Sequence, residues 1–193
     1  MILEGVIATS NEHGAAHVSA MGPEVDPQIE TLTLRPFETS STLTNLQRHP
    51  YGVFHVTDDV EQLVAAALPV QTVPLQLKTA TVVPGHVLSD CCRWYEFKVR
   101  DIDASKQRAV IQCEIVHCGH QRDFFGFNRA KHAVVEATIL ATRLHLLPRE
   151  EVELQIKQLE PLVRKTAGPV ERRAWETVVR YVATFDQPLG ATA

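Results

Sequence analysis

The most concentrated polar chemistry in the sequence is a run of hydroxyl-bearing residues in its first quarter. Arg35 lies just upstream of this run, in which five of the six residues from 39 to 44 are serine or threonine: Thr39, Ser40, Ser41, Thr42 and Thr44. The run opens a short predicted helix, whose N-terminus offers unpaired backbone N–H groups and the positive end of the helix dipole. Hydroxyls and a guanidinium add charge-assisted hydrogen bonds to the same anion. The pattern predicts a phosphate site; the alternative is that Ser40 or Ser41 only caps the helix.

A second group of polar residues opens a predicted helix later in the chain. Arg129, Lys131 and His132 fall in its first turn, where a cation opposes the helix dipole at a cost of about 0.3–1 kcal/mol at exposed sites. Each residue alone is typical of a solvated surface. Together they indicate an anion nearby, which makes Lys131 a candidate anion ligand beside the alternative of an ordinary surface lysine.

Other catalytic and metal-binding patterns are missing from the sequence. Cys113, His117, Cys118 and His120 lie close together, but along a strand Cys118 points away from Cys113 and His117, so no metal site is predicted. The sequence also has no nucleophile-elbow, Walker or Rossmann glycine pattern. Hydrolase, NTPase and dinucleotide-sheet functions therefore have no support.

Composition excludes further classes of partner. The chain has 193 residues, 45% of them hydrophobic, with a formal net charge of -4. It has no basic stripe of the kind that neutralises nucleic-acid phosphates, and no apolar stretch of the ~20 residues that span a bilayer. Four cysteines are too few to stabilise a chain of this length by disulfides. We therefore expect a cytoplasmic protein with reduced thiols and neither nucleic-acid nor membrane partners.

The elements that would hold the hydroxyl run are mostly antiparallel strands. Period-two alternation and turn residues predict strands at 2–9, 15–21, 28–34, 51–57, 78–88, 95–100 and 111–115, the fifth interrupted at Pro84-Gly85. Helices are predicted near 42–49 and over 58–68. Six or seven antiparallel strands with short helical insertions predict a small barrel, an α+β fold that is mainly β.

The pattern changes after Phe127. Asn128 can cap a helix from Arg129 to Leu147, and two more helices follow on either side of Gly168-Pro169. We therefore predict two domains, a barrel over residues 1–127 and a helical segment over residues 128–193.

Several motifs resemble one known superfamily. The SST of TSSTLTNL, followed by the strand GVFHV, is similar to the FMN-binding split-barrel superfamily of flavin reductases and pyridoxamine-phosphate oxidases. MILEG, MGPEVD, LRPFETSST, FHVTDD and FGFNRAKHAVVEA more closely resemble an uncharacterised family within it, a domain of unknown function. The resemblance implies a six-stranded Greek-key split barrel, a homodimer with FMN at the subunit interface, and a three-helix C-terminal appendage packed on the barrel and that interface.

The resemblance also implies positions for the cofactor-binding residues. The FMN phosphate would be held by five residues after the third strand: Arg35, Thr39, Ser40, Ser41 and Thr42. The anion indicated near Lys131 would then be this phosphate or a substrate carboxylate. Asn45, one turn into the helix, would reach the ribityl chain or the phosphate. His55 replaces an Asn that flavin reductases often carry, and its imidazole would face the pyrimidine edge of the flavin.

The resulting hypothesis is an FMN-binding flavoprotein that acts as an oxidoreductase of flavin-reductase type on an unknown small-molecule substrate or reductant. One alternative is a non-catalytic FMN-binding or sensory protein. Another is an accessory protein that kept the barrel and lost the cofactor, against which the hydroxyl run and Arg35 weigh.

Overall fold

A computed structural model describes residues 1–70 and 74–185 of the chain. The chain divides into two compact units, each formed from two separate segments. The sheet unit comprises Met1–Asp58 and Pro74–Phe124, and the helical unit comprises Asp59–Val73 and Phe125–Ala193. In this division residues 59–73 group with the C-terminal helices, whereas the sequence pattern placed them in the barrel domain. The domain boundary at residue 127 stays a prediction.

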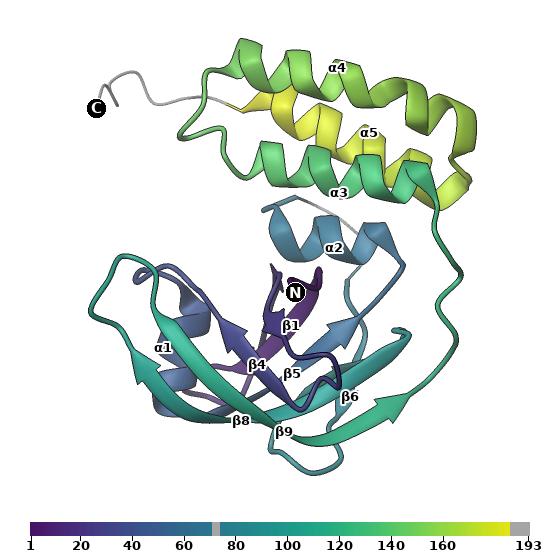
Figure 1. Ribbon diagram of the computed structural model, residues 1–193. Helices are drawn as coiled ribbons and strands as arrows, with labels where there is room; N and C mark the ends of the chain where they lie inside the picture. The colour runs from purple at the N-terminus through teal and green to yellow at the C-terminus, as the bar shows by residue number, and fades with distance from the viewer. Residues whose placement is uncertain (71–73, 186–193) are drawn as a thin grey trace. The chain divides into compact units, whose positions relative to one another are not determined.

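The sheet unit is built on one seven-stranded antiparallel sheet (Figure 1). Its strands, in spatial order, are β2 (Ala16–Met21), β1 (Gly5–Ser10), β5 (Tyr51–Val56), β8 (Arg93–Asp103), β9 (Val110–His120), β4 (Thr31–Leu34) and β3 (Glu24–Val25). The predicted split-barrel fold, mainly β with C-terminal helices, is confirmed. The main sheet has seven strands rather than six because β3, only two residues long, pairs with β4.

Local turn chemistry sets the first hairpin, which was predicted from the sequence. The side-chain oxygen of Asn11 accepts hydrogen bonds from the backbone N–H groups of His13 and Ala15, and Gly14 takes a φ of 77°. Only glycine adopts that conformation at little cost. The turn fixes the register in which β1 and β2 pair along their whole length.

The predicted strand over residues 28–34 begins three residues late, at Thr31. The carboxylate of Asp26 accepts hydrogen bonds from the N–H groups of Gln28, Glu30 and Thr31, and these bonds hold the segment as a turn. Ile29, inside the turn, has a φ of 55°, a left-handed conformation that no strand residue takes.

The core of the sheet unit explains where α1 (Ser41–Arg48) lies. Leu43 and Leu46 of α1 pack into one buried cluster with side chains of β1, β4, β5, β8 and β9, among them Ile7, Leu32 and Phe97. Leu43 and Leu46 are three residues apart and so share a helix face. Burial of this face fixes the orientation of α1, and with it the start of the helix.

A second, two-stranded sheet packs against the main one. The predicted strand at 78–88 is a hairpin of β6 (Leu77–Thr79) and β7 (His86–Leu88), because Pro84-Gly85 turns the chain. Val83 and Val87 of this segment bury against Val53 of β5.

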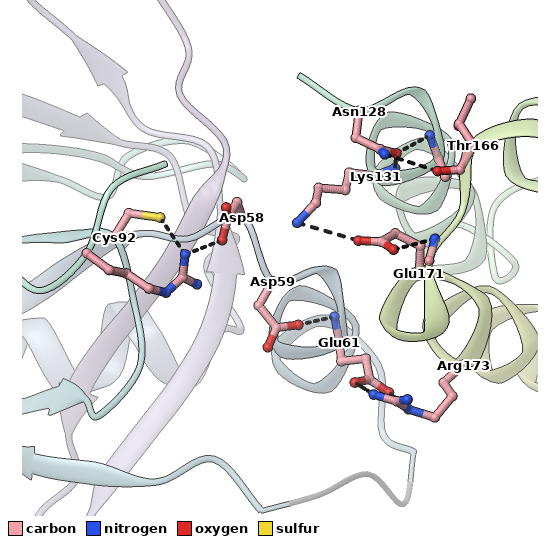
Figure 2. Close-up of polar contacts among 12 residues, drawn as sticks. Asp58, Asp59, Glu61, Cys92, Asn128, Lys131, Thr166, Glu171 and Arg173 are labelled. Atoms are coloured by element: carbon pink, nitrogen blue, oxygen red, sulfur yellow. Dashed lines mark hydrogen bonds and ion pairs between the residues drawn. The ribbon is translucent and has the colours of Figure 1, made fainter. Parts of the chain in front are cut away.

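The described residues of the helical unit form four helices: α2 (Val60–Ala67), α3 (Arg129–Ala141), α4 (Arg149–Thr166) and α5 (Pro169–Thr184). α3 contacts the other three, and α2 also packs on α5. One side chain of α5 and the N-cap residue of α3 join these helices (Figure 2). Arg173 donates to both carboxylate oxygens of Glu61 on α2 at 2.9 and 2.8 Å, and Asn128 donates to the carbonyl oxygen of Thr166 at 3.1 Å. Among the helices of the described ranges, none has the length and apolar character needed to cross a membrane.

Candidate functional site

The start of α1 was predicted to hold a phosphate, and its geometry begins with Ser40. Ser40 is the N-cap, and its hydroxyl oxygen accepts a hydrogen bond from the N–H of Leu43 at 3.2 Å. The carbonyl oxygen of Ser40 accepts from the backbone N–H of Thr44 at 3.2 Å. Ser40 therefore caps the helix, as one hydroxyl of the run was expected to do. Capping does not explain the other four hydroxyl-bearing residues of the run.

Two of the predicted site residues point into the protein. Thr42 is 2% exposed, and its hydroxyl lies 3.0 Å from that of Ser19 on β2. Asn45 is 5% exposed and donates its amide to the hydroxyl of Thr9 on β1 at 3.0 Å. These contacts join α1 to the edge of the main sheet. They are sufficient to explain both side chains structurally, and the predicted contact of Asn45 with FMN stays a prediction.

The rest of the helix start faces outward. The side chains of Thr39 and Ser41 are exposed. Within residues 1–70 and 74–185, no protein group accepts a hydrogen bond from the backbone N–H of Ser41 or Thr42. Two unpaired amides, two exposed hydroxyls and the positive end of the helix dipole thus lie together, and this is the arrangement that binds a phosphate.

Arg35 directly follows Leu34, the last residue of β4. Its guanidinium binds both carboxylate oxygens of Glu24, at 3.2 Å from Nε and 3.4 Å from Nη2, and both side chains are about half exposed, at 49% and 48%. The charge of Arg35 is therefore balanced by a carboxylate. To bind a phosphate through Nε and Nη2, Arg35 would have to leave Glu24.

Arg108 is a second cation at this turn, and sequence reasoning missed it. Its Nη1 donates to the carbonyl oxygen of Arg35 at 3.2 Å, and its guanidinium carbon lies 3.9 Å from the centre of the Phe37 ring. Arg108 is 73 residues from Arg35 in the sequence, so only the pairing of β9 with β4 could have pointed to it.

His55, predicted to face the flavin, lies wholly inside the sheet unit. Its Nδ1 lies 3.0 Å from the carbonyl oxygen of Val6, and its Nε2 accepts the N–H of Leu88 at 3.1 Å. A carbonyl oxygen can only accept, so Nδ1 carries the proton and the ring is neutral. Burial lowers the pKa of His55 to about 4, although the bond to Val6 opposes this shift. Because both ring nitrogens are bonded to the backbone, His55 has no free donor for a flavin, and we assign it a structural role.

Lys131 belongs to the helical unit. Its Nζ lies 3.5 Å from Oε1 of Glu171, whose other carboxylate oxygen accepts the N–H of Gly168 (Figure 2). The side chains of Lys131 and Glu171 are 18% and 10% exposed. Lys131 thus has a counter-charge within its own unit, and its predicted contact with FMN stays a prediction.

Asp58, a buried residue of the FHVTDD motif, belongs to an ion-pair network in the sheet unit. Nη1 of Arg122 lies 2.7 Å from Asp58 and 3.4 Å from the sulfur of Cys92, and Figure 2 shows Asp58 and Cys92 on either side of this guanidinium. Nε of Arg122 lies 2.7 Å from Asp90. Burial raises the pKa of the Cys92 thiol in spite of the nearby guanidinium. The thiol is therefore protonated near neutral pH and is a poor nucleophile, so the network is structural.

Comparison with known families identifies the chain. The family model described as "Protein of unknown function (DUF447) N-terminal domain" matches residues 3–122, and the one described as "Protein of unknown function (DUF447)" matches residues 128–180. The chain belongs to the DUF447 family. The resemblance to an uncharacterised split-barrel family is thereby confirmed. Among curated proteins, none matches this DUF447 sequence.

Solved structures similar to this DUF447 chain include flavoproteins. An FMN-bound DUF447 protein from Methanosarcina mazei is 22% identical and has a TM-score of 0.79, covering 93% of this chain and 94% of its own. The flavin reductase of styrene monooxygenase from Pseudomonas putida S12 is 13% identical, with a TM-score of 0.53 over 63% of this chain and 82% of its own. The 2-nitrobenzoate 2-nitroreductase of Pseudomonas fluorescens is 16% identical, with a TM-score of 0.53 over 61% of this chain and 64% of its own. These likenesses show a common fold.

Proposed function

We propose that this DUF447 protein binds FMN and holds the FMN phosphate at the start of α1. The observation that carries the proposal is the outward-facing helix start, with the unpaired amides of Ser41 and Thr42, in a fold whose Methanosarcina mazei relative is FMN-bound. Of the predicted ligands, Thr39 and Ser41 contribute hydroxyls, Ser40 keeps the helix start in place, and Thr42 contributes its amide.

The finer proposal is an oxidoreductase of flavin-reductase type. When bound, FMN supplies hydride and electron transfer, and the protein supplies binding, orientation and electrostatics. The residues at the start of α1 anchor the phosphate, which fixes the position of the whole cofactor. The substrate class is a small-molecule reductant or acceptor.

We further propose a homodimer with FMN at the subunit interface, as the family resemblance implies. Support comes from the sheet unit, where β2 forms one edge of the main sheet and every residue of it is half-buried. Support also comes from Phe125 and Phe127, which are 85% and 105% exposed. Two phenylalanines exposed to this degree and only two residues apart in the sequence offer apolar surface for a subunit contact.

The phosphate site can be tested by removing one backbone N–H group, that of Ser41. Ser41 occupies the first position of α1 after the N-cap, where proline is well tolerated because the N–H has no partner in the helix. Ser41→Pro therefore removes the amide and the hydroxyl and leaves the helix intact. Ser41→Ala, the matched control, removes only the hydroxyl. Pro169 already occupies the equivalent position at the start of α5.

The measurement is FMN affinity, with the flavin released on denaturation identified by its absorption spectrum and mass. We expect Ser41→Pro to bind FMN roughly tenfold to a hundredfold more weakly than Ser41→Ala, since the two variants differ by one hydrogen bond to a charged group, which contributes about 1.5–3 kcal/mol. Equal FMN affinity in Ser41→Pro and the wild type would refute the phosphate assignment. Anaerobic reduction of the bound flavin by NADH or NADPH would support the oxidoreductase proposal. If neither nucleotide reduces the bound flavin, the non-catalytic alternative is favoured.

A further inference from the structure

We propose that Arg108, at the end of the β8–β9 hairpin, is the principal cation for the FMN phosphate at the start of α1. This inference rests on the proposed function and adds to it a residue that neither the sequence motifs nor the family resemblance assigned.

Backbone hydrogen bonds attach the hairpin end to the turn that leads into α1. Glu38 donates its N–H to the carbonyl oxygen of Gln107 at 2.9 Å, and Ala109 donates to that of Pro36 at 2.9 Å. Phe37 and Arg108 face each other as a β-bridge between these two bonds. In Figure 1 the loop between β8 and β9 lies near α1. The position of Arg108 is thus fixed by the same backbone that positions the helix start.

The connection from Arg108 to the helix cap is short. Ser40, the N-cap, donates its N–H to the carbonyl oxygen of Phe37 at 3.0 Å, so residues 37–40 form one turn. The first and fourth Cα atoms of such a turn lie within about 7 Å of each other. Phe37, on whose ring the guanidinium of Arg108 stacks, therefore belongs to the same turn as the N-cap of α1, and the proposal places the phosphate between that guanidinium and the helix start.

Arg108 also differs from most arginines of the sheet unit in its charge balance. Four of the unit's six arginines pair with carboxylates: Arg35 with Glu24, Arg48 with Glu12, Arg100 with Glu114, and Arg122 with Asp58 and Asp90. Within the described part of the chain no carboxylate pairs with Arg108 or Arg93, and Arg93 begins β8, at the far end of the hairpin. The charge of Arg108 is therefore available to a ligand.

The stacked geometry suits phosphate binding. An arginine has five N–H donors in a planar fork that matches phosphate oxygens. The Phe37 ring covers one face of the guanidinium, and one donor is bonded to the carbonyl oxygen of Arg35. These contacts hold the fork in place while its other donors remain for an anion, so little side-chain freedom is lost on binding. Arg35, by contrast, would have to leave Glu24 first.

The test compares the affinities of FMN and riboflavin, which differ by the phosphate, using the fluorescence of the titrated flavin. The variants are Arg108→Ala, and Arg108→Gln as a form that keeps the side-chain stem and a donor for Arg35. Arg100→Ala is the matched control, since Arg100 is an exposed arginine of the same hairpin whose partner is Glu114. Thermal unfolding of each variant verifies that it is folded.

We expect Arg108→Ala and Arg108→Gln to weaken FMN binding by roughly tenfold to a hundredfold, and riboflavin binding by less than about twofold. Arg100→Ala should leave both affinities unchanged. Two results would overturn the assignment of Arg108 while the proposed function stands: Arg108→Gln binds FMN as tightly as the wild type, or the affinities for FMN and riboflavin fall equally. A wild-type protein that binds no FMN would overturn both.

Discussion

Glu96 on β8 is a buried carboxylate on which a loop of the sheet unit depends, and its replacement by glutamine gives a sharp test. The Glu96 side chain is 0% exposed. One carboxylate oxygen accepts the N–H of Thr81 at 2.7 Å and the indole N–H of Trp94 at 3.1 Å; the other accepts the N–H groups of Val82 and Val83 at 2.6 and 2.8 Å. The carboxylate therefore fixes three consecutive residues of the segment between β6 and β7.

The expected loss follows from this geometry. Glutamine has one acceptor oxygen and one NH₂ group, so in either orientation two of the four donors face a donor instead of an acceptor. Each hydrogen bond to a charged group contributes about 1.5–3 kcal/mol, so Glu96→Gln should cost about 3–6 kcal/mol. Because whole domains are stable by only about 5–15 kcal/mol, the loss should be evident in any unfolding experiment.

The pH dependence of the wild type provides a second signature. Burial would raise the pKa of Glu96, but the three backbone N–H groups and the indole outweigh burial, and the pKa is lowered overall. The carboxylate thus stabilises the folded state above the unfolded pKa of about 4.3, and this stabilisation is lost as the pH falls through the lower folded value. Glu96→Gln should lack this acid-dependent loss.

The assay is urea unfolding at pH 7 combined with hydrogen exchange of the amides of Thr81, Val82 and Val83. The matched control is Glu38→Gln, a change at an exposed carboxylate of the same unit. We expect faster exchange at the three amides and lower stability in Glu96→Gln alone. If Glu96→Gln is as stable as Glu38→Gln and its three amides stay protected, the reasoning is wrong.

Three further predictions concern single contacts. His55→Gln should remove a pH dependence of stability. The folded pKa of His55, about 4, lies below the unfolded value of about 6.5, so the unfolding free energy of the wild type should fall by about 3 kcal/mol as the pH drops from 6.5 to 4. An equally steep fall of the unfolding free energy with pH in the variant would contradict this. Asn128→Ala removes two hydrogen bonds that cap α3 and one to the carbonyl oxygen of Thr166, so the unfolding free energy should fall by about 1–3 kcal/mol in denaturant titrations. Gly119→Ala should destabilise the sheet unit by about 1–3 kcal/mol, because the added methyl group would overlap the Trp94 indole; an unchanged melting temperature would show that the indole can move aside.

Local signals in the sequence were enough to predict most elements. The turn at Asn11–Gly14, the caps Ser40 and Asn128, and the two-residue alternation of the long strands each depend on neighbouring residues, and the structure has these elements where they were expected. The phosphate-site hypothesis also began locally, since a helix start and the residues around it are adjacent in the chain. Two strand predictions changed in the structure. The strand predicted over residues 28–34 begins only at Thr31, and the strand predicted over 78–88 with an interruption at Pro84-Gly85 is a hairpin of two short strands.

The roles of individual polar side chains were decided by contacts between distant residues. Thr42 and Asn45 belong to the hydroxyl-rich segment, yet they point toward Ser19 and Thr9 because burial of Leu43 and Leu46 sets the rotation of α1. His55 is bonded on both sides because β1 and β7 flank it. Arg108 reaches the helix start through strand pairing across 73 residues. Short-range preferences define helices, strands and turns, but which side chains remain free for a ligand depends on long-range pairing, and that is fixed only when the whole sheet forms.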